Sequence, residues 1–452
     1  MECRLQQYFQ AVNQYPLIAR NDFDQVWIFT AGDQLTVGEV LFRARTLSQI
    51  LPDHRYCLLL CEHRINFIIG FLAALWCKQT VLLPPNRSPE VTQSLLSEYP
   101  DSGCLTDTDD KVSNAETLLY DYVTATQGSI SEIPLIDSRQ LACLVFTSGS
   151  TGKPAANAKF WGDLVQGVRL LQLRYDFNEE DYLVATVPAQ HMYGLETTVL
   201  LPMMSPVSVY GGMPFFPEDI RRALSLSSKK ATLLSTPLHL RVCVQAGLSW
   251  PELRQLISAT APLSREDAGR AEREFGAGLR EIYGSTECGA IASRITVDEQ
   301  RWTLYDDVKL IFDEDCVRVA APHLPHKPIL ADRIEALDDE HFLMYGRTSD
   351  MIKIAGKRVS LADLNLRLNS VPGVEDGVFI QTKVKSEDVS RLCAVIVAPV
   401  LSQADVIKAL RQQIDPVFLP RAVFKVDTLP RNETGKLPHS EIMKLLGKLI
   451  NR

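Results

Sequence analysis

The chain has 452 residues, of which 46% are apolar and 23% are charged, a composition typical of soluble globular proteins. Its 47 Lys and Arg against 55 Asp and Glu give a net charge of −8. No long basic run is present, so we do not expect nucleic acid as a partner, because phosphate backbones are held mainly by Lys and Arg. One compact unit rarely reaches this length, which predicts a large domain and at least one smaller one.

The cysteines and the apolar runs indicate the compartment. The 10 cysteines form no CxxC pair and no zinc-type spacing with His, which favours reduced, buried thiols. The amino terminus lacks the apolar stretch of a signal peptide. The longest apolar run, Ile65 to Cys77, is shorter than the roughly 20 residues of a membrane span. We therefore expect a buried helix there, no membrane span and a cytoplasmic protein.

The first half of the chain alternates strand-like and helix-like patterns. Tyr56–Leu60 and Thr80–Leu83 predict buried strands on either side of a helix over Asn66–Trp76. This order predicts an α/β fold with mostly parallel sheets covered by helices. Later candidates are strands at Cys143–Phe146, Leu183–Pro188 and Val207–Tyr210, the segment Glu252–Ile257 before a turn, and a helix at Ser264–Phe275 that Ser264 could cap.

The pattern changes near residue 348, where shorter units begin. They are Met351–Ile354, Ala362–Leu368, Gly377–Gln381, Leu392–Ala398 and a helix from about Ala404 to Ile414. We predict a large domain at 1–348 and a small α+β domain at 349–452. No Pro/Gly/Ser-rich linker precedes the second domain, so their junction is expected to be a short hinge.

A Gly/Ser/Thr loop follows the predicted strand Cys143–Phe146. Its residues are Thr147, Ser148, Gly149, Ser150, Thr151, Gly152 and Lys153. Hydroxyl donors, close backbone approach at the glycines and one ammonium group suit a polyphosphate. It is not a Walker A loop, since two residues separate its glycines and Pro154 follows the lysine. The alternative is a flexible polar loop.

Three further segments are chemically informative. Tyr283-Gly284-Ser285-Thr286-Glu287 sets a carboxylate beside hydroxyls, which could hold Mg²⁺ through oxygen, although a Tyr before a turn is more often a packing residue. The third segment runs from Gly346 to Gly356. The fourth, from Leu429 to Leu437, contains Lys436 in a polar turn, where simple solvation is the usual explanation for a lysine.

Taken together, the four segments resemble those of the adenylate-forming superfamily: acyl-CoA synthetases, adenylation domains of nonribosomal peptide synthetases, and beetle luciferases. They occur in that family's order and at about its spacing, and the resemblance covers nearly the whole chain. The segment AQHMYGLE is similar to small stand-alone ligases of aryl-polyene-type clusters in secondary metabolism.

The resemblance implies an ATP site and a catalytic set. The loop Thr147–Lys153 would hold the β- and γ-phosphates. The adenosine contacts would come from Thr260, Ala261 and Pro262, from Tyr283, Gly284 and Ser285, and from Asp332 and Arg347 at the ribose. The catalytic groups would be Lys436, Glu287 and Thr286, with Glu287 and Thr147 on the metal.

The resemblance also implies the remaining sites. The acyl pocket would be lined by His191, Tyr193, Gly194 and Ala259. Gly356 and Arg358 would border the arm of the thiol, and Ser349 would stand at the hinge. In the first half-reaction the ammonium of Lys436 and a bound Mg²⁺ would offset the repulsion between the carboxylate and the α-phosphate.

The implied function is ATP-dependent activation of a small carboxylic acid to an acyl-adenylate, followed by transfer to CoA or to the phosphopantetheine of an acyl carrier protein. Aryl or unsaturated acids are favoured over long-chain fatty acids and amino acids. In the family the adenine turn usually contains Gly-Gly-Ala, where this chain has Ser258-Ala259-Thr260-Ala261. Two further departures from the family pattern are Ala155 in place of a lysine and Ser349 at the hinge. They motivate the alternative of a catalytically lapsed nucleotide-binding partner or regulatory protein.

Overall fold

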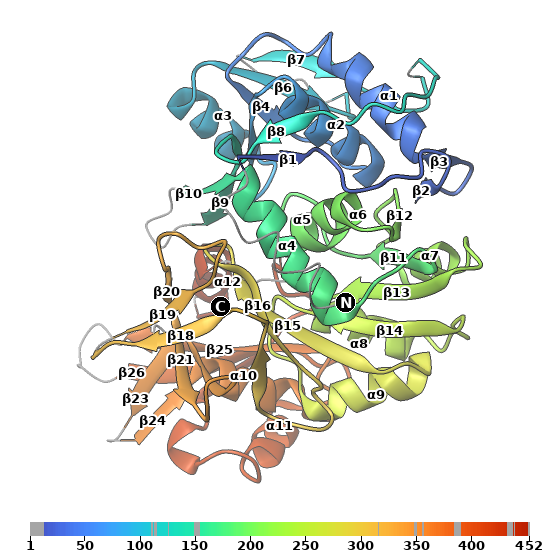
Figure 1. The fold of residues 1–452 in the computed structure, drawn as a ribbon. Coiled ribbons are helices and arrows are strands. Elements are labelled where there is room, and N and C mark those ends of the chain that lie inside the picture. Colours follow the sequence, from blue (N-terminus) through green and yellow to red (C-terminus); the bar gives the residue numbers. More distant parts are fainter. Residues whose placement is uncertain are drawn as a thin grey trace.

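The computed structural model describes residues 13–109, 112, 115–124, 126–148, 154–314, 316–347, 350–354, 357–383, 390–431, 437 and 439–450. Two large sheets and their helices form most of the molecule, and all but one of the smaller sheets come from the carboxyl-terminal part of the chain (Figure 1). The α/β fold is confirmed. The sheets are mixed, however, since antiparallel strands flank a parallel part in each of them.

The first sheet has six strands in the order β10-β9-β5-β4-β6-β7. Their bounds are β10 Pro154–Phe160, β9 Leu141–Ser148, β5 Thr80–Leu83, β4 Tyr56–Leu59, β6 Ser102–Thr106 and β7 Glu116–Leu119. Its helices are α1 Val37–Ser48, α2 Arg64–Trp76 and α3 Pro89–Glu98. The predicted strand, helix and strand are therefore present as β4, α2 and β5. The hairpin β9–β10 forms the antiparallel edge of this sheet.

The second sheet has eleven strands in the order β21-β22-β17-β16-β15-β14-β13-β11-β12-β2-β3. Their bounds are β21 Asp332–Ala336, β22 His341–Arg347, β17 Trp302–Leu304, β16 Gly289–Arg294, β15 Leu279–Ser285, β14 Leu253–Ser258, β13 Lys230–Ser235, β11 Asp181–Ala185, β12 Ser208–Tyr210, β2 Val26–Phe29 and β3 Gln34–Thr36. The run from β15 to β2 is parallel. Parallel strands place all their carboxyl ends at one edge.

Helices connect and cover these strands. They are α4 Trp161–Tyr175, α5 Met192–Leu195, a π-helical turn Glu196–Leu200, α6 Leu201–Met204, α7 Pro217–Leu224, α8 Pro237–Gln245 and α9 Arg265–Phe275. Ser264 caps α9 as predicted, because its hydroxyl accepts the backbone N–H of Asp267. The strand expected at Leu183–Pro188 ends earlier, at Ala185.

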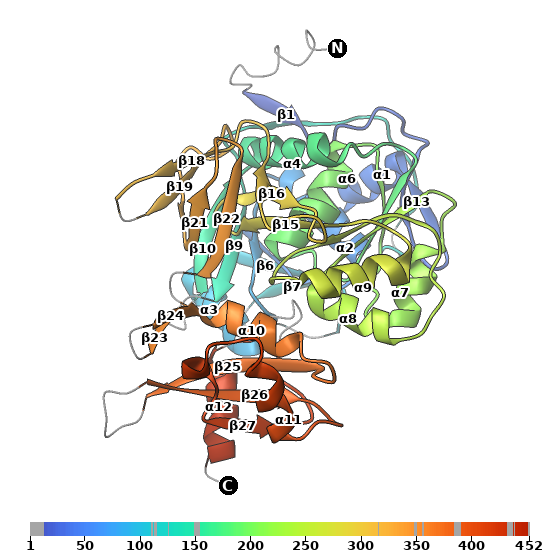
Figure 2. The ribbon, with the colours of Figure 1, turned by 90° about the horizontal axis from the view of Figure 1, so that it is seen from below.

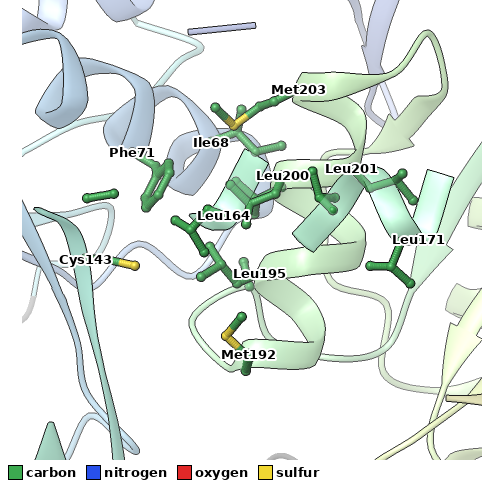
Figure 3. Close-up of a cluster of buried hydrophobic side chains, with 14 of the residues drawn as sticks. Ile68, Phe71, Cys143, Leu164, Leu171, Met192, Leu195, Leu200, Leu201 and Met203 are labelled. Atoms are coloured by element: carbon green, nitrogen blue, oxygen red, sulfur yellow. The ribbon is translucent and has the colours of Figure 1, made fainter. Parts of the chain in front are cut away.

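The two large sheets share one apolar core. Every residue of α2 from Arg64 to Leu75 is buried, as expected of a helix that is apolar all round. Figure 3 shows Ile68 and Phe71 of α2 facing Leu164 of α4 and Leu195 of α5. This shared core explains the apolar run that the sequence shows before Cys77.

Smaller sheets complete the chain. β1 Gln14–Pro16 pairs with β8 Leu135–Asp137, and β18 Lys309–Phe312, β19 Val317–Ala320 and β20 Ile329–Leu330 form a three-stranded sheet. The last elements are β23 Met351–Ile354, β24 Lys357–Ser360, α10 Leu361–Asn369, β25 Asp376–Lys383, β26 Ser390–Val397, α11 Gln403–Leu410, a 3₁₀ turn Pro416–Phe418, β27 Ala422–Lys425 and α12 His439–Ile450. They form a lobe at one end of the molecule (Figure 2).

This lobe has an apolar core that includes Leu364, Leu368, Phe379 and Ile396. A separate core fits the predicted small domain, while the boundary at 348/349 stays a prediction, since Ser349 lies outside the described residues. The helix expected from Ala404 to Ile414 ends at Leu410, and Ile414 reaches the same core from the turn that follows.

All nine cysteines in the described ranges are free thiols, and seven of them are buried, as the sequence indicates. Within these ranges, none of the helices combines the length and the apolar character that crossing a bilayer requires.

Arg64 ties the two large sheets together. It is 1% exposed, and its guanidinium donates to the carbonyl oxygens of Tyr210 at 3.3 Å, Gly212 at 2.5 Å, Ala185 at 3.4 Å and Val187 at 2.7 Å. Burial lowers the pKa of Arg64 to about 10, so it stays protonated at neutral pH. The start of α2 therefore fixes the chain just beyond β11 and β12.

Replacing Arg64 with Met is expected to lower the free energy of unfolding by about 3 kcal/mol, because buried carbonyl oxygens lose their donors. Urea unfolding measures the loss. Arg222→Met is the control, since Arg222 makes an exposed ion pair with Glu218 and its loss should cost at most about 0.5 kcal/mol. Equal losses in the two variants would contradict the role of Arg64.

Candidate active site

The predicted site residues gather where parallel strands end. The segments that follow β11, β14 and β15 contain His191, Thr260 and Glu287, respectively. β11 pairs with β13, β13 with β14, and β14 with β15, all in parallel register. Open α/β sheets bind ligands outside the carboxyl ends of such strands. The topology therefore brings segments that are distant in sequence to one edge, which we call the carboxyl edge.

The clearest contact at this site joins two residues predicted for adenosine. The hydroxyl of Tyr283 donates to Oδ2 of Asp332 at 2.7 Å. The Tyr283 ring is buried against Trp302 and Phe342, at centroid distances of 5.5 and 5.7 Å. The pairing of β21 with β22 places Asp332 opposite Arg347, whose side chain lies outside the description. A fixed carboxylate beside a tyrosine can accept ribose hydroxyls.

The turn predicted at the adenine is strained. Thr260 has a φ of +81°, a left-handed conformation that β-branched residues rarely adopt. Ala261 and Pro262 after it are exposed. Where the family has glycine, this chain therefore carries a side chain on a strained backbone, and such strain is common at ligand sites.

Glu281, which the sequence did not single out, holds this turn. It is buried, and its Oε1 accepts the backbone N–H of Leu263 at 3.2 Å. Its Oε2 accepts from Arg294 Nε at 2.7 Å and from Thr296 Oγ1 at 2.5 Å. Burial raises the pKa of Glu281, and Arg294 opposes that effect. The carboxylate thus links β15 to the segment that precedes α9.

The turn after β15 presents the predicted metal ligand. Glu287 is exposed, and the turn is closed by the N–H of Cys288, which donates to Ser285 Oγ at 3.4 Å. A Cβ added at Gly284 would lie 2.1 Å from the carbonyl oxygen of Gly289. The close approach of β15 and β16 therefore requires glycine at 284.

The donor set suits Mg²⁺ brought by a nucleotide. In the described part of the chain, His, Cys, Asp and Glu side chains do not form groups of three or more that could hold a metal. Mg²⁺ in nucleotide enzymes is commonly bound by one or two carboxylates together with substrate phosphates. Glu287, with Thr286 beside it, offers a carboxylate and a hydroxyl in this way.

Only the first residues of the predicted phosphate loop belong to the described part of the chain. Thr147 is half-buried near the end of β9 and pairs with Ala155 across the hairpin, and Ser148 pairs with Pro154. The Ser148 side chain and the residues Gly149, Ser150, Thr151, Gly152 and Lys153 lie outside the description. Ala155 is exposed, so a methyl group stands where the family has a lysine.

Two of the residues predicted for the acyl pocket have structural partners. Tyr193 donates its hydroxyl to the carbonyl oxygen of Ile257 at 3.1 Å, which joins α5 to β14. A Cβ at Gly194 would lie 1.9 Å from the carbonyl oxygen of Pro188, so packing alone requires this glycine. His191 is half-buried before α5, and Ala259 is buried after β14.

Glu196 is a second buried carboxyl group that the sequence reasoning passed over, although it ends the segment AQHMYGLE. Its oxygens accept the N–H of Ala290 at 3.1 and 3.3 Å. A Cβ at Gly289 would lie 2.3 Å from Glu196 Oε1. Burial raises the pKa of Glu196 to about 7. Its position in a π-helical turn is a signal often associated with functional sites.

The carboxyl ends of β11 and β13 also carry a buried polar cluster. Thr186 Oγ1 lies 2.9 Å from Ser235 Oγ and 3.2 Å from His239 Nδ1. Burial lowers the pKa of His239, which favours the neutral imidazole. No periodic pattern predicts this cluster, because Thr186 follows β11, Ser235 ends β13 and His239 lies in α8.

Other predicted residues are not brought to this edge by described contacts. Lys436, Ser349 and Gly356 lie outside the described residues. Arg358 is in β24 opposite Lys353, and its side chain is not described.

Two hollows lie elsewhere on the described surface. One is lined by residues of α9, including Arg265 and Glu272. The other lies at the amino ends of β14 and β15 and is lined by residues that include Arg174, Arg254 and Arg280. The Arg254 guanidinium already contacts Asp181, which weakens the second hollow as an anion site.

Comparisons with known proteins show the family and the fold of this chain. The family described as AMP-binding enzyme matches residues 28–323. The chain is 26% identical to a 4-coumarate–CoA ligase of Halorhodospira halophila over 340 residues, 71% of this chain and 82% of that protein. The chain covers 54% and 64% of the length of two further relatives.

Solved structures share the fold. ATP-bound MatB from Rhodopseudomonas palustris is 18% identical with a TM-score of 0.80, covering 96% of this chain and 98% of that one. The anthranilate CoA ligase AuaEII in complex with anthranoyl-AMP is 16% identical with a TM-score of 0.81, covering 97% and 98%.

Tyr283→Phe is expected to weaken ATP binding about 5-fold, because Asp332 loses the hydrogen bond that orients it, worth about 1 kcal/mol. Calorimetry with ATP and Mg²⁺ measures the change. Tyr345→Phe is the matched control, since its hydroxyl donates at 2.6 Å to Glu335, which lies in β21 like Asp332 but on the exposed surface. Equal weakening by both changes would remove Tyr283 from the site.

Glu196→Gln is expected to change how stability depends on pH. An acid whose pKa is raised from 4.5 to about 7 on folding binds more protons in the native state between these values, so its contribution to stability falls as pH rises. The variant lacks that loss. Relative to the parent protein, its unfolding free energy should therefore rise between pH 4.5 and 7. Parallel stability curves would show that Glu196 has no raised pKa.

Proposed function

Because the chain belongs to the AMP-binding enzyme family, the adenylate-forming superfamily of AMP-forming acid–thiol ligases, we propose that it converts a carboxylic acid and ATP to an acyl-adenylate and then to a thioester. The observation that carries this proposal is the Tyr283–Asp332 hydrogen bond on the strand that leads into the Glu287 turn. It joins the proposed ribose acceptor, Asp332, to Tyr283, which lies shortly before the proposed metal ligand, Glu287, in the chain.

In the first half-reaction, an oxygen of the substrate carboxylate bonds to the α-phosphorus, and the bond to the pyrophosphate oxygen breaks. Asp332 accepts ribose hydroxyls and Tyr283 keeps its carboxylate in place. Glu287 and Thr147 would hold Mg²⁺ through oxygen, with Thr286 beside them as a catalytic residue, and the metal would supply positive charge against the phosphates. The loop Thr147–Lys153 binds the β- and γ-phosphates, and Lys436 stabilises charge at the transferring group.

In the second half-reaction, a thiolate bonds to the acyl carbon, and AMP leaves with the oxygen that joined it. The acceptor is CoA or the phosphopantetheine of a carrier protein, and Gly356 and Arg358 border its arm. This step requires the small domain, 349–452, to turn about the hinge at Ser349 so that Lys436 withdraws.

We propose an aryl or unsaturated acid as the acyl substrate. The 4-coumarate and anthranilate ligases, by their names, activate aromatic acids. In this chain Ala259 is buried, and Thr260 projects from a strained backbone, so side chains stand where the family has glycines and shorten the pocket. His191 and Tyr193 supply flat rings beside it. A role in an aryl-polyene-type cluster stays a prediction.

The exposed methyl group of Ala155 favours the alternative of a lapsed nucleotide-binding protein, because a phosphate-binding cation is missing there. The two functions differ in pyrophosphate release.

ATP-dependent pyrophosphate release is expected with at least one class of acid in a panel of benzoates, cinnamates, short and long fatty acids, and amino acids. Lys436→Ala and Glu287→Gln should each lower the rate by roughly 100-fold or more, because each removes charge stabilisation from the transferring group. Lys448→Ala, at an exposed lysine of α12, is the control and should keep the parent rate. If no acid in the panel causes pyrophosphate release while ATP still binds, the result would support the alternative of a catalytically lapsed nucleotide-binding protein.

A further inference from the structure

Lys159 is a buried lysine on the strand that follows the phosphate loop. It lies in β10 and is 8% exposed. Side chains alternate along a strand, so Lys159 shares a face with Asn157 and Ala155. Ala155 is exposed, Asn157 is half-buried and Lys159 is buried, which shows that this face turns from solvent into the molecule. A lysine at such a place requires a partner, because burying an unpaired ammonium group is costly.

The partner is the backbone of the predicted metal ligand. The Lys159 ammonium donates to the carbonyl oxygen of Glu287 at 3.0 Å. Across the described residues, this carbonyl is the one hydrogen-bond acceptor that the ammonium reaches. The contact joins the hairpin of the first sheet to the turn between β15 and β16 of the second.

Lys159 does not take the place of the lysine missing at 155. Four residues along a strand span about 13 Å, which is more than a lysine side chain can bridge. Its ammonium donates instead to the Glu287 carbonyl, so the contact that Lys159 makes is with the Glu287 turn.

The turn that contains Glu287 is held at several points, so the hydrogen bond from Lys159 can affect the position of the Glu287 side chain. Its amino side is held by Gly284, which approaches Gly289, and its centre by the Cys288 N–H on Ser285 Oγ. The hydrogen bond from Lys159 fixes the peptide group that follows the Glu287 side chain. Without it, the Glu287 carboxylate sits on an exposed turn with one fewer anchor.

We propose that Lys159 is a positioning residue for Glu287, which fixes the backbone of this turn and so directs the Glu287 carboxylate toward Mg²⁺. The inference rests on the proposed function, because it takes Glu287 as the metal ligand. Because Ala155 replaces a lysine, the contact between Lys159 and Glu287 matters more in this chain. With a methyl group in place of a phosphate-binding cation, more of the polyphosphate charge falls to Mg²⁺, and the placement of its ligand matters more.

The test uses the intact chain and measures how Mg²⁺ tightens the binding of ATP, a readout that needs no turnover. In Lys159→Met, the Mg²⁺ concentration that gives half of this tightening should rise roughly 10-fold, as for other residues that orient a metal ligand. The affinity for ATP without Mg²⁺ should stay within about 2-fold, because the adenosine contacts are untouched. Lys159→Arg keeps a charged donor and should recover much of the loss.

Lys229→Met is the matched control. Lys229 is half-buried and donates to Ser208 Oγ at 2.8 Å at the opposite, amino-terminal ends of β12 and β13. Its loss should leave the Mg²⁺ requirement unchanged. If Lys159→Met does not fold, Lys159→Gln, with a shorter uncharged side chain, carries the same expectation.

An unchanged Mg²⁺ requirement in folded Lys159→Met or Lys159→Gln would overturn the inference. Equal weakening of ATP binding with and without Mg²⁺ would also overturn it, since that result indicates a structural role alone. If Mg²⁺ does not tighten ATP binding in the parent protein, the roles of Glu287 and Lys159 fall together. Silence in pyrophosphate release with normal Mg²⁺ tightening would contradict the proposed reaction and leave the role of Lys159 standing.

Discussion

The site depends on one constraint at the carboxyl edge of the large sheet: the backbone groups in its turns need hydrogen-bond partners. The turns that leave the parallel strands have backbone groups without strand partners. Unpaired buried backbone groups are costly, by about 1–3 kcal/mol each. Buried charged side chains pair with several of them here. Arg64 binds carbonyl oxygens beyond β11 and β12, and Lys159 binds that of Glu287.

Two buried carboxylates act in the opposite sense and accept hydrogen bonds from backbone N–H groups. Glu281 receives the N–H of Leu263, and Glu196 receives that of Ala290. Each of these side chains fixes a different turn: the strained turn at Thr260 in one case and the start of β16 in the other. Under the proposed function, a site that holds a nucleotide, a metal and an acid in register benefits from turns that are fixed before the ligands arrive. In this protein, buried ionic side chains fix these turns.

The sequence predicted the parts of this arrangement that are local. A buried strand, a fully apolar helix and a second strand follow from runs of apolar residues, and Ser264 as a helix cap follows from its place before α9. The resemblance placed Tyr283 and Asp332 in one site, and the structure joins them by a hydrogen bond. The antiparallel strands beyond β15 were not predicted, because strand direction depends on pairing rather than on local pattern.

The supporting residues could not be predicted, for a physical reason. Lys159 and Glu281 lie just outside the motifs, and each acts on a residue from another strand or turn. Their sequence signal is a charged residue within an apolar or mixed strand, which is equally typical of a solvated edge. Gly194 shows the converse, since its place in a family motif suggested the acyl pocket, while the carbonyl oxygen of Pro188 already requires it.

The central claim is that ATP and Mg²⁺ bind at the carboxyl edge, and amide hydrogen exchange with and without them tests it most directly. We predict slower exchange at three described segments, 259–264, 281–290 and 330–336, together with the phosphate loop Thr147–Lys153. The three segments contain the adenine turn, the Glu287 turn and Asp332, respectively. Protection of the opposite edge instead, at 174–181 and 253–255 around the hollow lined by Arg174 and Arg254, would contradict the claim.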